Sequence, residues 1–396
     1  MNVITGTIIY LGNFKVLEMN AAGKRVFANA KLLEKCGYHV VLIGNDSFPQ
    51  KELKSVAIDG IEVYSFESYK KKIRRVDILA YFKTFKEIIQ KHEKVSHIIC
   101  YGSPSLSLFN LLVIRFANNK RITVVTDVVD WLSADSGNFV FRFLKQTDIN
   151  FRNGYINTRY DKIIVISQWL KEYYSKYYDI NKIIVIPPLI YNKPKESLPN
   201  NTITELIYAG VPFTLNHRIT NLSNVKDRID IMLKLLRIAK ERGASFHLSI
   251  YGFTKEQLLH SIPSLIDDVS RLNDSVCFFG KVPMKTISKA LEDADYTIFF
   301  RNISRTTMAG FPTKIVESLS AGVPVITTKT TNIEDYVNIG TEVFYLNLDR
   351  EDESIETLML LLKMNLIDKT SNRRKCYSNV SFYIDSYIDV MKDYLG

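Results

Sequence analysis

Short apolar runs alternate with longer amphipathic runs along the first half of the chain. The apolar runs have the length of strands buried on both faces, and the run Ala21–Lys35 between the first two has the period of a helix, with Gly37 ending it. The predicted strands are Thr7–Leu11, His39–Ile43, His97–Tyr101, Ile122–Thr126, Lys162–Ile166 and Ile183–Ile186. Strands that alternate with helices at this spacing predict a doubly wound parallel sheet, which is an α/β fold.

The same alternation begins again after a polar, proline-bearing stretch. The sequence KPKESLPNNT, which precedes Thr204, has no hydrophobic period and is the best linker in the chain. Beyond it the predicted strands are Glu205–Tyr208, Phe246–Tyr251, Val276–Phe279 and Tyr296–Phe300, and the predicted helices are Ser223–Arg242, Lys255–Ser261 and Lys285–Leu291. We therefore expect two Rossmann-like domains, 1–190 and 191–380, facing each other across a cleft. The amphipathic end, Ser381–Leu395, is expected to return to the first domain as a helix (381–396).

One stretch of the second half, Phe311–Ile326, combines helix, cap and strand signals. Its sequence FPTKIVESLSAGVPVI predicts a helix that begins near Thr313 and ends at Gly322, with Pro324 before a short strand. The amides at the start of such a helix suit a phosphate or diphosphate. Glu317, one turn further on, could accept hydrogen bonds from a ribose.

Cationic and turn residues follow several predicted strands of the second half. Gly210, Gly280–Lys281 and Arg301 come directly after strands, and Lys226 lies near the start of a predicted helix. The carboxyl ends of parallel strands share one edge of a sheet, so we expect these residues near Thr313. Lys226 and Arg301 could then neutralise a diphosphate, although Lys226 also fits an ordinary surface position.

Two loops of the first half could also meet a ligand. Asn20, Ala21, Ala22 and Gly23 offer small residues at the start of the first helix, and Gly23 serves equally well for helix packing. Asp127 and Asp130 follow a predicted strand, where they could face the cleft or cap a helix. No GxGxxG motif occurs, so an NAD site has little support.

The net charge of +10 belongs to the first half alone. Residues 1–190 hold 27 Lys and Arg against 17 Asp and Glu, a difference of +10, and the remainder holds 25 of each. The densest basic run is Lys70–Lys72 with Arg74–Arg75, followed by a helical pattern over Val76–Lys94. A solvated loop and an anionic membrane surface or lipid phosphate both explain this run; no nucleic-acid motif accompanies it.

Other classes of protein and site receive little support. The sequence has no secretory signal pattern and no apolar run of membrane-spanning length, so we expect a cytoplasmic protein, at most peripheral on the inner face of the membrane. The four cysteines are far apart, which favours four buried thiols over disulfides or a zinc site. No GxSxG or HExxH motif is present and no carboxylate cluster marks a metal site, so we expect metal-independent chemistry without a nucleophilic triad.

The second half resembles the family-4 glycosyltransferases of the GT-B fold. The resemblance is carried by Leu206–Gly210, Val225–Asp227, Ile250–Gly252, Phe278–Lys281, Ala294–Arg301, Gly310–Glu317 and Ala321–Ile326, with looser matches at Gly37–Tyr38, Val165–Trp169 and Val185–Pro187. It is closest to members that build capsule or lipopolysaccharide. The resemblance implies a retaining, metal-independent hexosyltransferase with no cofactor. It also implies a UDP- or GDP-linked sugar donor in the second domain and a glycan or lipid-linked saccharide acceptor in the first.

The resemblance assigns roles by position. Glu317 would hold the nucleotide ribose, Lys226 and Arg301 would meet the diphosphate, and Asp130 would take part in catalysis in the first domain. The remaining donor-site positions are Gly210, Gly280, Lys281, Val282, Phe311, Pro312, Thr313 and Lys314, and the acceptor or phosphate loop is Asn20, Ala21, Ala22 and Gly23.

The chain departs from the family pattern at several positions. Ala309 stands where the first glutamate of the paired-glutamate motif is expected, and Val211 replaces an arginine that often follows the first strand's glycine. Asn20–Ala21 replaces a glycine pair, and Val129 replaces a histidine. Two alternatives to a glycosyltransferase therefore stay open: a non-catalytic glycan- or nucleotide-binding subunit, and a nucleotide-sugar epimerase.

Overall fold

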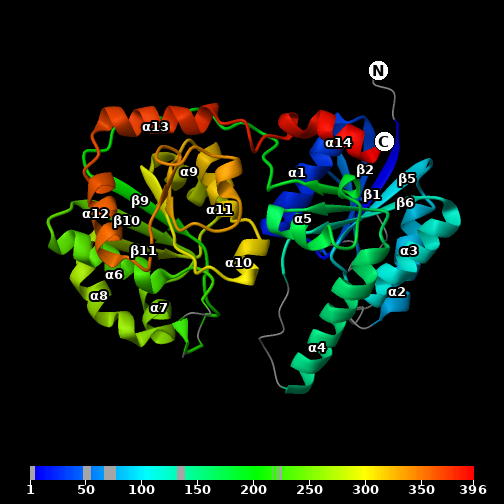
Figure 1. The fold of residues 1–396 in the computed structure, drawn as a ribbon, viewed down its shortest axis with the longest axis horizontal. Helices are drawn as coiled ribbons and strands as arrows, with labels where there is room; N and C mark the ends of the chain where they lie inside the picture. The colour runs from blue at the N-terminus through cyan, green and yellow to red at the C-terminus, as the bar shows by residue number, and fades with distance from the viewer. Residues whose placement is uncertain are drawn as a thin grey trace. The chain divides into compact units, whose positions relative to one another are not determined.

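The computed structural model describes residues 5–47, 55–66, 77–131, 139–215, 217–219, 221–222 and 225–396. The chain forms two compact units, and each has its own sheet (Figure 1). Unit 1 comprises Met1–Tyr191, Ala309–Phe311 and Tyr383–Gly396; unit 2 comprises Asn192–Met308 and Pro312–Phe382. The bounds expected from the sequence were 1–190, 191–380 and 381–396; the observed unit 1 also includes Ala309–Phe311 and takes up the chain again at Tyr383.

Unit 1 is built on a sheet whose strand order, in the described residues, is β3-β4-β2-β1-β5-β6-β7-β8. The strands are β1 (Gly6–Gly12), β2 (Tyr38–Gly44), β3 (Val56–Ile58), β4 (Ile61–Ser65), β5 (Val95–Tyr101), β6 (Thr123–Val128), β7 (Lys162–Val165) and β8 (Ile183–Val185). All neighbours are parallel except β3 and β4, which form an antiparallel hairpin at the edge. The sequence pattern did not predict this hairpin because β3 is a short edge strand without a buried residue.

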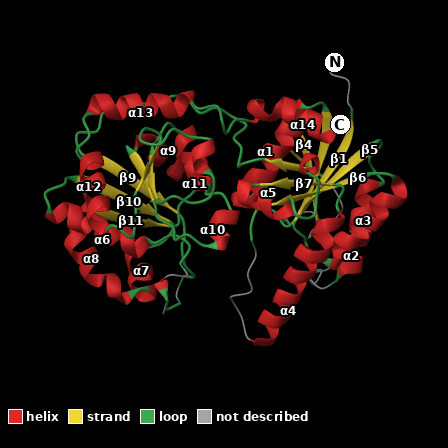
Figure 2. Cartoon of the chain, viewed as in Figure 1, coloured by secondary structure: helices red, strands yellow, loops and turns green. Residues whose placement is uncertain are grey.

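Helices cover both faces of this sheet (Figure 2). They are α1 (Ala21–Lys35), α2 (Ile78–Ile89), α3 (Leu108–Lys120), α5 (Gln168–Tyr174) and α14 (Ile388–Leu395), and a further helix, α4 (Phe139–Phe151), extends away from the sheet (Figure 1). Side chains of β1 alternate between two cores, Ile8 and Tyr10 packing on the face of α1 and α14, and Ile9 and Leu11 on the face of α2 and α3. This period of two is the reason that strands of a doubly covered sheet are apolar throughout.

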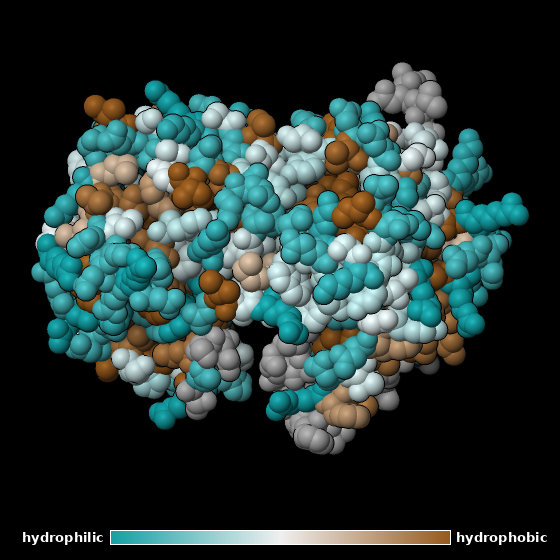
Figure 3. Space-filling view, in the orientation of Figure 1, coloured by the Kyte–Doolittle hydropathy of each residue, from teal (hydrophilic) through white to brown (hydrophobic). Residues whose placement is uncertain are grey.

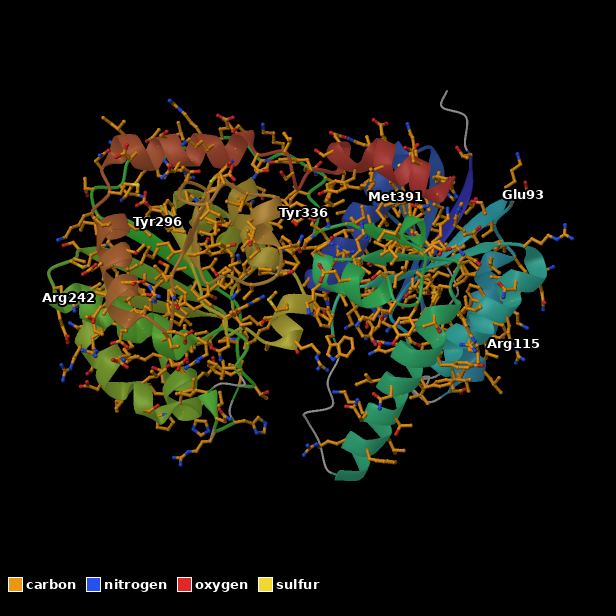
Figure 4. The ribbon with its side chains drawn as sticks, in the orientation of Figure 1. Glu93, Arg115, Arg242, Tyr296, Tyr336 and Met391 are labelled. Atoms are coloured by element: carbon orange, nitrogen blue, oxygen red, sulfur yellow. The ribbon has the colours of Figure 1, made fainter. Side chains whose placement is uncertain are left out.

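Unit 2 has a fully parallel sheet with the order β11-β10-β9-β12-β13-β14 in the described residues. Its strands are β9 (Thr204–Ala209), β10 (Phe246–Tyr251), β11 (Val276–Gly280), β12 (Tyr296–Ile298), β13 (Val325–Thr327) and β14 (Val343–Tyr345). Its helices are α6 (Ile229–Glu241), α7 (Lys255–Ser261), α8 (Ile266–Leu272), α9 (Met284–Asp293), α10 (Arg305–Ala309, whose last residue is grouped with unit 1), α11 (Thr313–Ser320), α12 (Glu351–Leu362) and α13 (Leu366–Ser378). Tyr296 on the central strand β12 is fully buried (Figure 4). Two doubly wound sheets of mainly parallel strands confirm the predicted fold class.

Several predicted bounds were wrong. The helix predicted over Ser223–Arg242 begins at Ile229, and Ser223 lies outside the described residues. The helix predicted within Val76–Lys94 spans only Ile78–Ile89. The Asp77 side chain sets its start by accepting a hydrogen bond from the Ala80 amide at 3.1 Å. The basic run Lys70–Lys72 with Arg74–Arg75 lies outside the described residues.

The C-terminal segment also differs in detail from its prediction. A turn of 3-10 helix, Ile384–Tyr387, precedes α14, so the segment is not one continuous α-helix. Met391 of α14 is 1% exposed and packs in the core shared with α1 and β1 (Figure 4). The apolar face of the C-terminal segment, which the sequence pattern indicated, is therefore buried in unit 1.

The prediction of four buried thiols holds for three of them. Cys36, Cys100 and Cys376 are buried, whereas Cys277 is exposed. Cys277 lies on β11, the edge strand of its sheet, where residues 277 and 279 face solvent. Burial raises the pKa of the Cys36 thiol to about 11 and that of Cys100 to about 12, which keeps both protonated at neutral pH.

Hydrophilic residues cover most of the visible surface, and apolar residues are scattered among them in small groups (Figure 3). None of the helices in the described part of the chain is long and apolar enough to cross a membrane.

Candidate functional site

The stretch Phe311–Ile326 adopts the predicted helix, turn and strand. Helix α11 begins after Pro312, and Gly322 follows its end with φ 73° before β13. A Cβ atom on Gly322 would lie 2.2 Å from Cε2 of the Tyr377 ring on α13. Gly322 is therefore required both by its left-handed backbone and by the ring against which the turn packs.

Two glycines bring the end of β9 close to α11. Gly210 follows β9 with φ 151°, and Gly252 follows β10 with φ 118°. A Cβ on Gly252 would lie 2.3 Å from the Gly210 carbonyl oxygen, and one on Gly210 would lie 2.8 Å from Nζ of Lys314. The absence of both side chains lets the Lys314 ammonium lie directly over the turn that follows β9.

Asp227 holds two cations at this point. Its carboxylate pairs with Arg301 Nε at 2.7 Å and with the Lys314 ammonium, and Tyr208 donates its hydroxyl to Oδ2 at 2.9 Å. The side chains of Asp227, Arg301 and Lys314 are 4%, 9% and 16% exposed. We call these three residues with Tyr208 the Asp227 cluster.

The electrostatics of the Asp227 cluster are set by burial and by the excess of cations. Burial opposes ionisation of Asp227, but Lys314 and Arg301 outweigh it and hold the pKa of the carboxyl well below its usual range. For Lys314, burial is the largest influence, and with repulsion from Arg301 and Lys226 it lowers the pKa to about 8 despite the attraction of Asp227. The Lys314 ammonium also lies 3.9 Å from the centre of the Tyr208 ring.

Lys226 is the exposed member of this group of cations. It precedes Asp227 directly and lowers the pKa of Lys314, which places its charge within electrostatic reach. In the part of the chain that the structure describes, no hydrogen bond or ion pair to the Lys226 side chain is recorded. Asp227 thus pairs with two cations, Arg301 and Lys314, and Lys226 is a third cation nearby. From the sequence, only the backbone amide of Lys314 was expected at the site. The position of Lys314 at the start of α11, directly after Phe-Pro-Thr, was the sequence feature that could have indicated a charged side chain at the site.

The other predicted donor-site residues lie at the same edge of the sheet. Gly280 ends β11 and accepts a hydrogen bond from the Gly252 amide at 2.7 Å, with Lys281 exposed after it and Val282 partly buried. Phe311 and Pro312 are buried immediately before α11, and Thr313 begins it. Glu317 is half-buried one turn into the helix. Their common location follows from the parallel topology, and their binding roles stay predictions.

A pocket of about 660 Å³ lies beside Arg301 in unit 2. Asn302, Thr328, Tyr345 and Asn347 are among its lining residues, which follow the carboxyl ends of β12, β13 and β14. Arg301 therefore pairs with Asp227 and also lines an open pocket of mixed polar and apolar residues. The described residues contain no group of three or more His, Cys, Asp and Glu side chains that could hold a metal ion.

The predicted acceptor loop of unit 1 divides into capping, packing and pocket residues. Asn20 caps α1, accepting a hydrogen bond from the Gly23 amide at 2.9 Å, and Ala21 follows it at an exposed position. A Cβ on Gly23 would lie 2.1 Å from the Lys15 carbonyl oxygen, so this glycine serves the packing of α1. Ala22 lines a pocket together with Asp130.

Asp127 forms a buried ion pair and caps no helix. Arg25 donates to its carboxylate from Nη2 at 2.7 Å and Nε at 3.0 Å, and donates from Nη1 to the carbonyl oxygens of Ile186 and Pro187. Tyr10 also donates its hydroxyl to Asp127. This ion pair was not predicted from the sequence, although an arginine inside the apolar pattern of the first helix indicates that it needs a buried acidic partner. Asp130, by contrast, is exposed at the pocket.

Comparisons with known proteins agree with this architecture. Residues 217–364 match the family model Glycosyl transferases group 1, which spans most of unit 2. A search of curated protein sequences found no match.

Solved structures of similar fold cover the whole chain. The lipopolysaccharide outer core galactosyltransferase WaaB is 13% identical, with a TM-score of 0.60 over 98% of this chain and 99% of that one. A sucrose-phosphate synthase from Thermosynechococcus elongatus is 12% identical, with a TM-score of 0.67 over 98% and 97%. The pneumococcal O-GlcNAc transferase GtfA, in complex with UDP and GlcNAc, is 12% identical with a TM-score of 0.63 over 98% of each chain. The fold is that of the GT-B glycosyltransferases.

Proposed function

We propose that this protein is a glycosyltransferase that moves a sugar from a nucleotide-sugar to a glycan or lipid-linked acceptor in surface polysaccharide synthesis. The observation that carries the proposal is the Asp227 cluster, which places two buried cations and the exposed Lys226 beside the start of α11. The match of residues 217–364 to Glycosyl transferases group 1 supports the same reaction class. The UDP bound to GtfA makes a UDP-sugar the first donor to test.

The diphosphate is the group that this arrangement suits. Lys226, Lys314 and the amides at the start of α11 would hold its oxygens, with Arg301 at the edge of the neighbouring pocket. Negative charge grows on the diphosphate as the bond to the sugar breaks, so cations fixed beforehand stabilise the transition state more than the bound donor. These side chains offer charge neutralisation without a metal ion, and we include metal independence and the absence of a cofactor in the proposal.

Retention of anomeric configuration is the stereochemical part of the proposal and is supported by the resemblance to family-4 enzymes. The departing phosphate would help the acceptor hydroxyl to attack the same face of the sugar, with no enzyme nucleophile. Asp130, exposed at the pocket of unit 1, is the proposed acceptor-side residue.

The change Glu317→Ala tests the donor site directly. We expect it to weaken the binding of UDP by about tenfold or more, because a carboxylate that accepts hydrogen bonds from ribose hydroxyls contributes about 1.5–3 kcal/mol. Isothermal titration calorimetry measures the affinity, and circular dichroism confirms the fold. Glu356→Ala on α12 is the matched control, since Glu356 is an exposed helical glutamate of the same unit. Equal UDP affinity for the wild type and Glu317→Ala would count against the assignment.

A non-catalytic binding subunit is the second candidate, and Ala309 favours it. Ala309 is fully buried in α10 and replaces the carboxylate that the resemblance expects to contact the donor sugar. Slow release of UDP from a UDP-sugar distinguishes the two candidates, since a pure binder releases none.

We further propose that unit 1 binds anionic membrane, where a lipid-linked acceptor would be found. Helix α4 extends away from the sheet of unit 1 (Figure 1) and exposes apolar side chains, with Phe143 65% and Leu144 61% exposed. Phe151 is seven residues beyond Leu144, so the two share one side of the helix. Arg142 and Lys145 lie beside them, and residues 1–190 carry the net charge of +10 counted above. An apolar face flanked by cations suits the surface of an anionic bilayer.

Vesicle sedimentation tests this surface. We expect the protein to sediment with vesicles that contain phosphatidylserine and less so with phosphatidylcholine alone, and 0.5 M salt should reduce the binding because it screens the charges. Leu144→Ser should weaken the binding several-fold through lost apolar contact, whereas Leu360→Ser on α12 of unit 2, where Leu360 is 74% exposed, should leave it unchanged. Equal binding of both variants, or equal binding to neutral vesicles, would contradict the proposal.

A further inference from the structure

A polar pocket of about 270 Å³ lies at the carboxyl edge of the unit 1 sheet. Its walls come from the ends of β5 and β6, the loops that follow β1, β5 and β6, one residue each of α1 and α3, and the segment after α4. Its polar lining residues are Asn13, Tyr101, Ser103, Asn110, Thr126, Asp127, Asp130, Arg152 and Asn157. All the described residues that line this pocket belong to unit 1.

Arg152 is the cation of this pocket. It begins a turn of π-helix, Arg152–Ile156, directly after α4. Such turns are rare and often occur at functional sites. Gly102 faces it with φ 61°, and even a Cβ on Gly102 would lie 3.8 Å from Nη1 of Arg152, so the loop after β5 leaves the guanidinium accessible from the pocket.

The Arg152 guanidinium has no recorded hydrogen bond or ion pair within the described residues. Asp148, the nearby carboxylate on α4, is already held by Ser107, whose amide and hydroxyl donate to it at 3.0 and 2.8 Å. The pKa of Arg152 is lowered by burial, although Tyr174, Asp148, Tyr160 and Asp130 partly offset the effect. Arg152 is partly exposed at this pocket, and a guanidinium that is partly desolvated without a bonded partner in the described residues would be stabilised by an anionic ligand.

Arg25, the other arginine beside this edge of the sheet, differs from Arg152 in having bonded partners within the fold. Its guanidinium is paired with Asp127 and two carbonyl oxygens, which satisfies it within the fold. Three charged side chains line the pocket: Asp127, which Arg25 neutralises, Arg152 and the exposed Asp130. A ligand that suits both has an anionic group for Arg152 and a hydroxyl that can donate to Asp130.

We propose that this pocket binds a saccharide carrying an anionic substituent, a phosphate ester or a carboxylate, with Arg152 holding the anion and Asp130 a sugar hydroxyl. Its assignment as the acceptor of the transfer rests on the proposed function. The volume of about 270 Å³ is sufficient for one sugar ring with its substituent.

Calorimetry on the full chain, with UDP present at saturation to occupy unit 2, tests the pocket. The probes are glucose 1-phosphate, glucuronate, glucose and inorganic phosphate. We expect one or both of the anionic sugars to bind at least about tenfold more tightly than glucose and than inorganic phosphate, because only they satisfy both residues. Binding by the phosphate ester alone identifies a phosphorylated saccharide, and binding by glucuronate alone identifies a uronate.

The variant Arg152→Gln should lose the preference for anionic sugars, and Arg152→Lys should keep part of it because the charge remains. Arg159→Gln is the matched control: Arg159 is an arginine of the same segment that lies over the Tyr155 ring and donates to the Tyr155 carbonyl oxygen at 2.7 Å. It should bind like the wild type, and thermal melts should confirm that all variants fold.

Two outcomes would overturn the proposal: equal affinity of wild type and Arg152→Gln for the anionic sugars, or inorganic phosphate or glucose binding as tightly as they do. UDP binding in unit 2 should be unchanged by Arg152→Gln. Failure of the sugar titrations with normal UDP binding would therefore reject this inference and leave the proposed function standing.

Discussion

Lys314→Gln should weaken UDP binding by about 10- to 100-fold. The ammonium of Lys314 lies over Gly210 beside the start of α11, where the proposed diphosphate would bind. A charge-assisted hydrogen bond in such a setting contributes about 1.5–3 kcal/mol, which corresponds to that loss. Calorimetry at pH 7 measures it, with Lys363→Gln, an exposed lysine after α12, as the control.

The same lysine makes the binding depend on pH. Burial lowers the pKa of Lys314 to about 8, so the ammonium is mostly protonated at pH 7 and loses its proton as the pH rises through 8. UDP affinity should therefore fall between pH 7 and 9 in the wild type. In Lys314→Arg it should stay level, because arginine remains charged. A Lys314→Gln variant with wild-type affinity, or a wild type whose affinity is constant over this range, would show that Lys314 does not contact the diphosphate.

Asp227→Asn should lower the free energy of unfolding of unit 2 by about 3–5 kcal/mol. The change leaves Arg301 and Lys314 as buried cations without their shared counter-charge, and breaking a buried ion pair by removing one partner has a cost of this size. Thermal melting measures the loss. Asp274→Asn, at an exposed position before β11, should melt like the wild type.

Asp227→Asn should also change how the stability of unit 2 depends on pH in the acid range. The folded-state pKa of Asp227 lies below its value of about 3.9 in an unfolded chain, so its contribution is present above that value and is lost as the pH falls through the folded pKa. The wild type should therefore lose more stability than Asp227→Asn between pH 5 and pH 2. Equal melting temperatures for the two proteins at pH 7 would exclude the clamping role of Asp227.

Much of the fold was predictable because it depends on local patterns. The βα alternation, the linker before Thr204, and the Phe-Pro-Thr start and Gly322 end of α11 are each determined by residues close together in the chain. The edge hairpin β3–β4 was missed because a short strand exposed on both faces has no apolar period. The exposure of Cys277 depends on β11 lying at the edge of its sheet, which strand order decides.

The sequence by itself determined that Glu317, Arg301 and Lys226 belong to loops and helix starts at one edge of a parallel sheet, since strand polarity places every βα loop there. Only the tertiary structure decided which charges meet. Asp227 joins Arg301 and Lys314 across 74 and 87 residues of chain, and Arg25 joins Asp127 across 102. The same packing leaves Arg152 without such a partner in the described residues. The physical reason is that hydrophobic period and capping act within a few residues, whereas the pairing of buried charges depends on packing between distant elements.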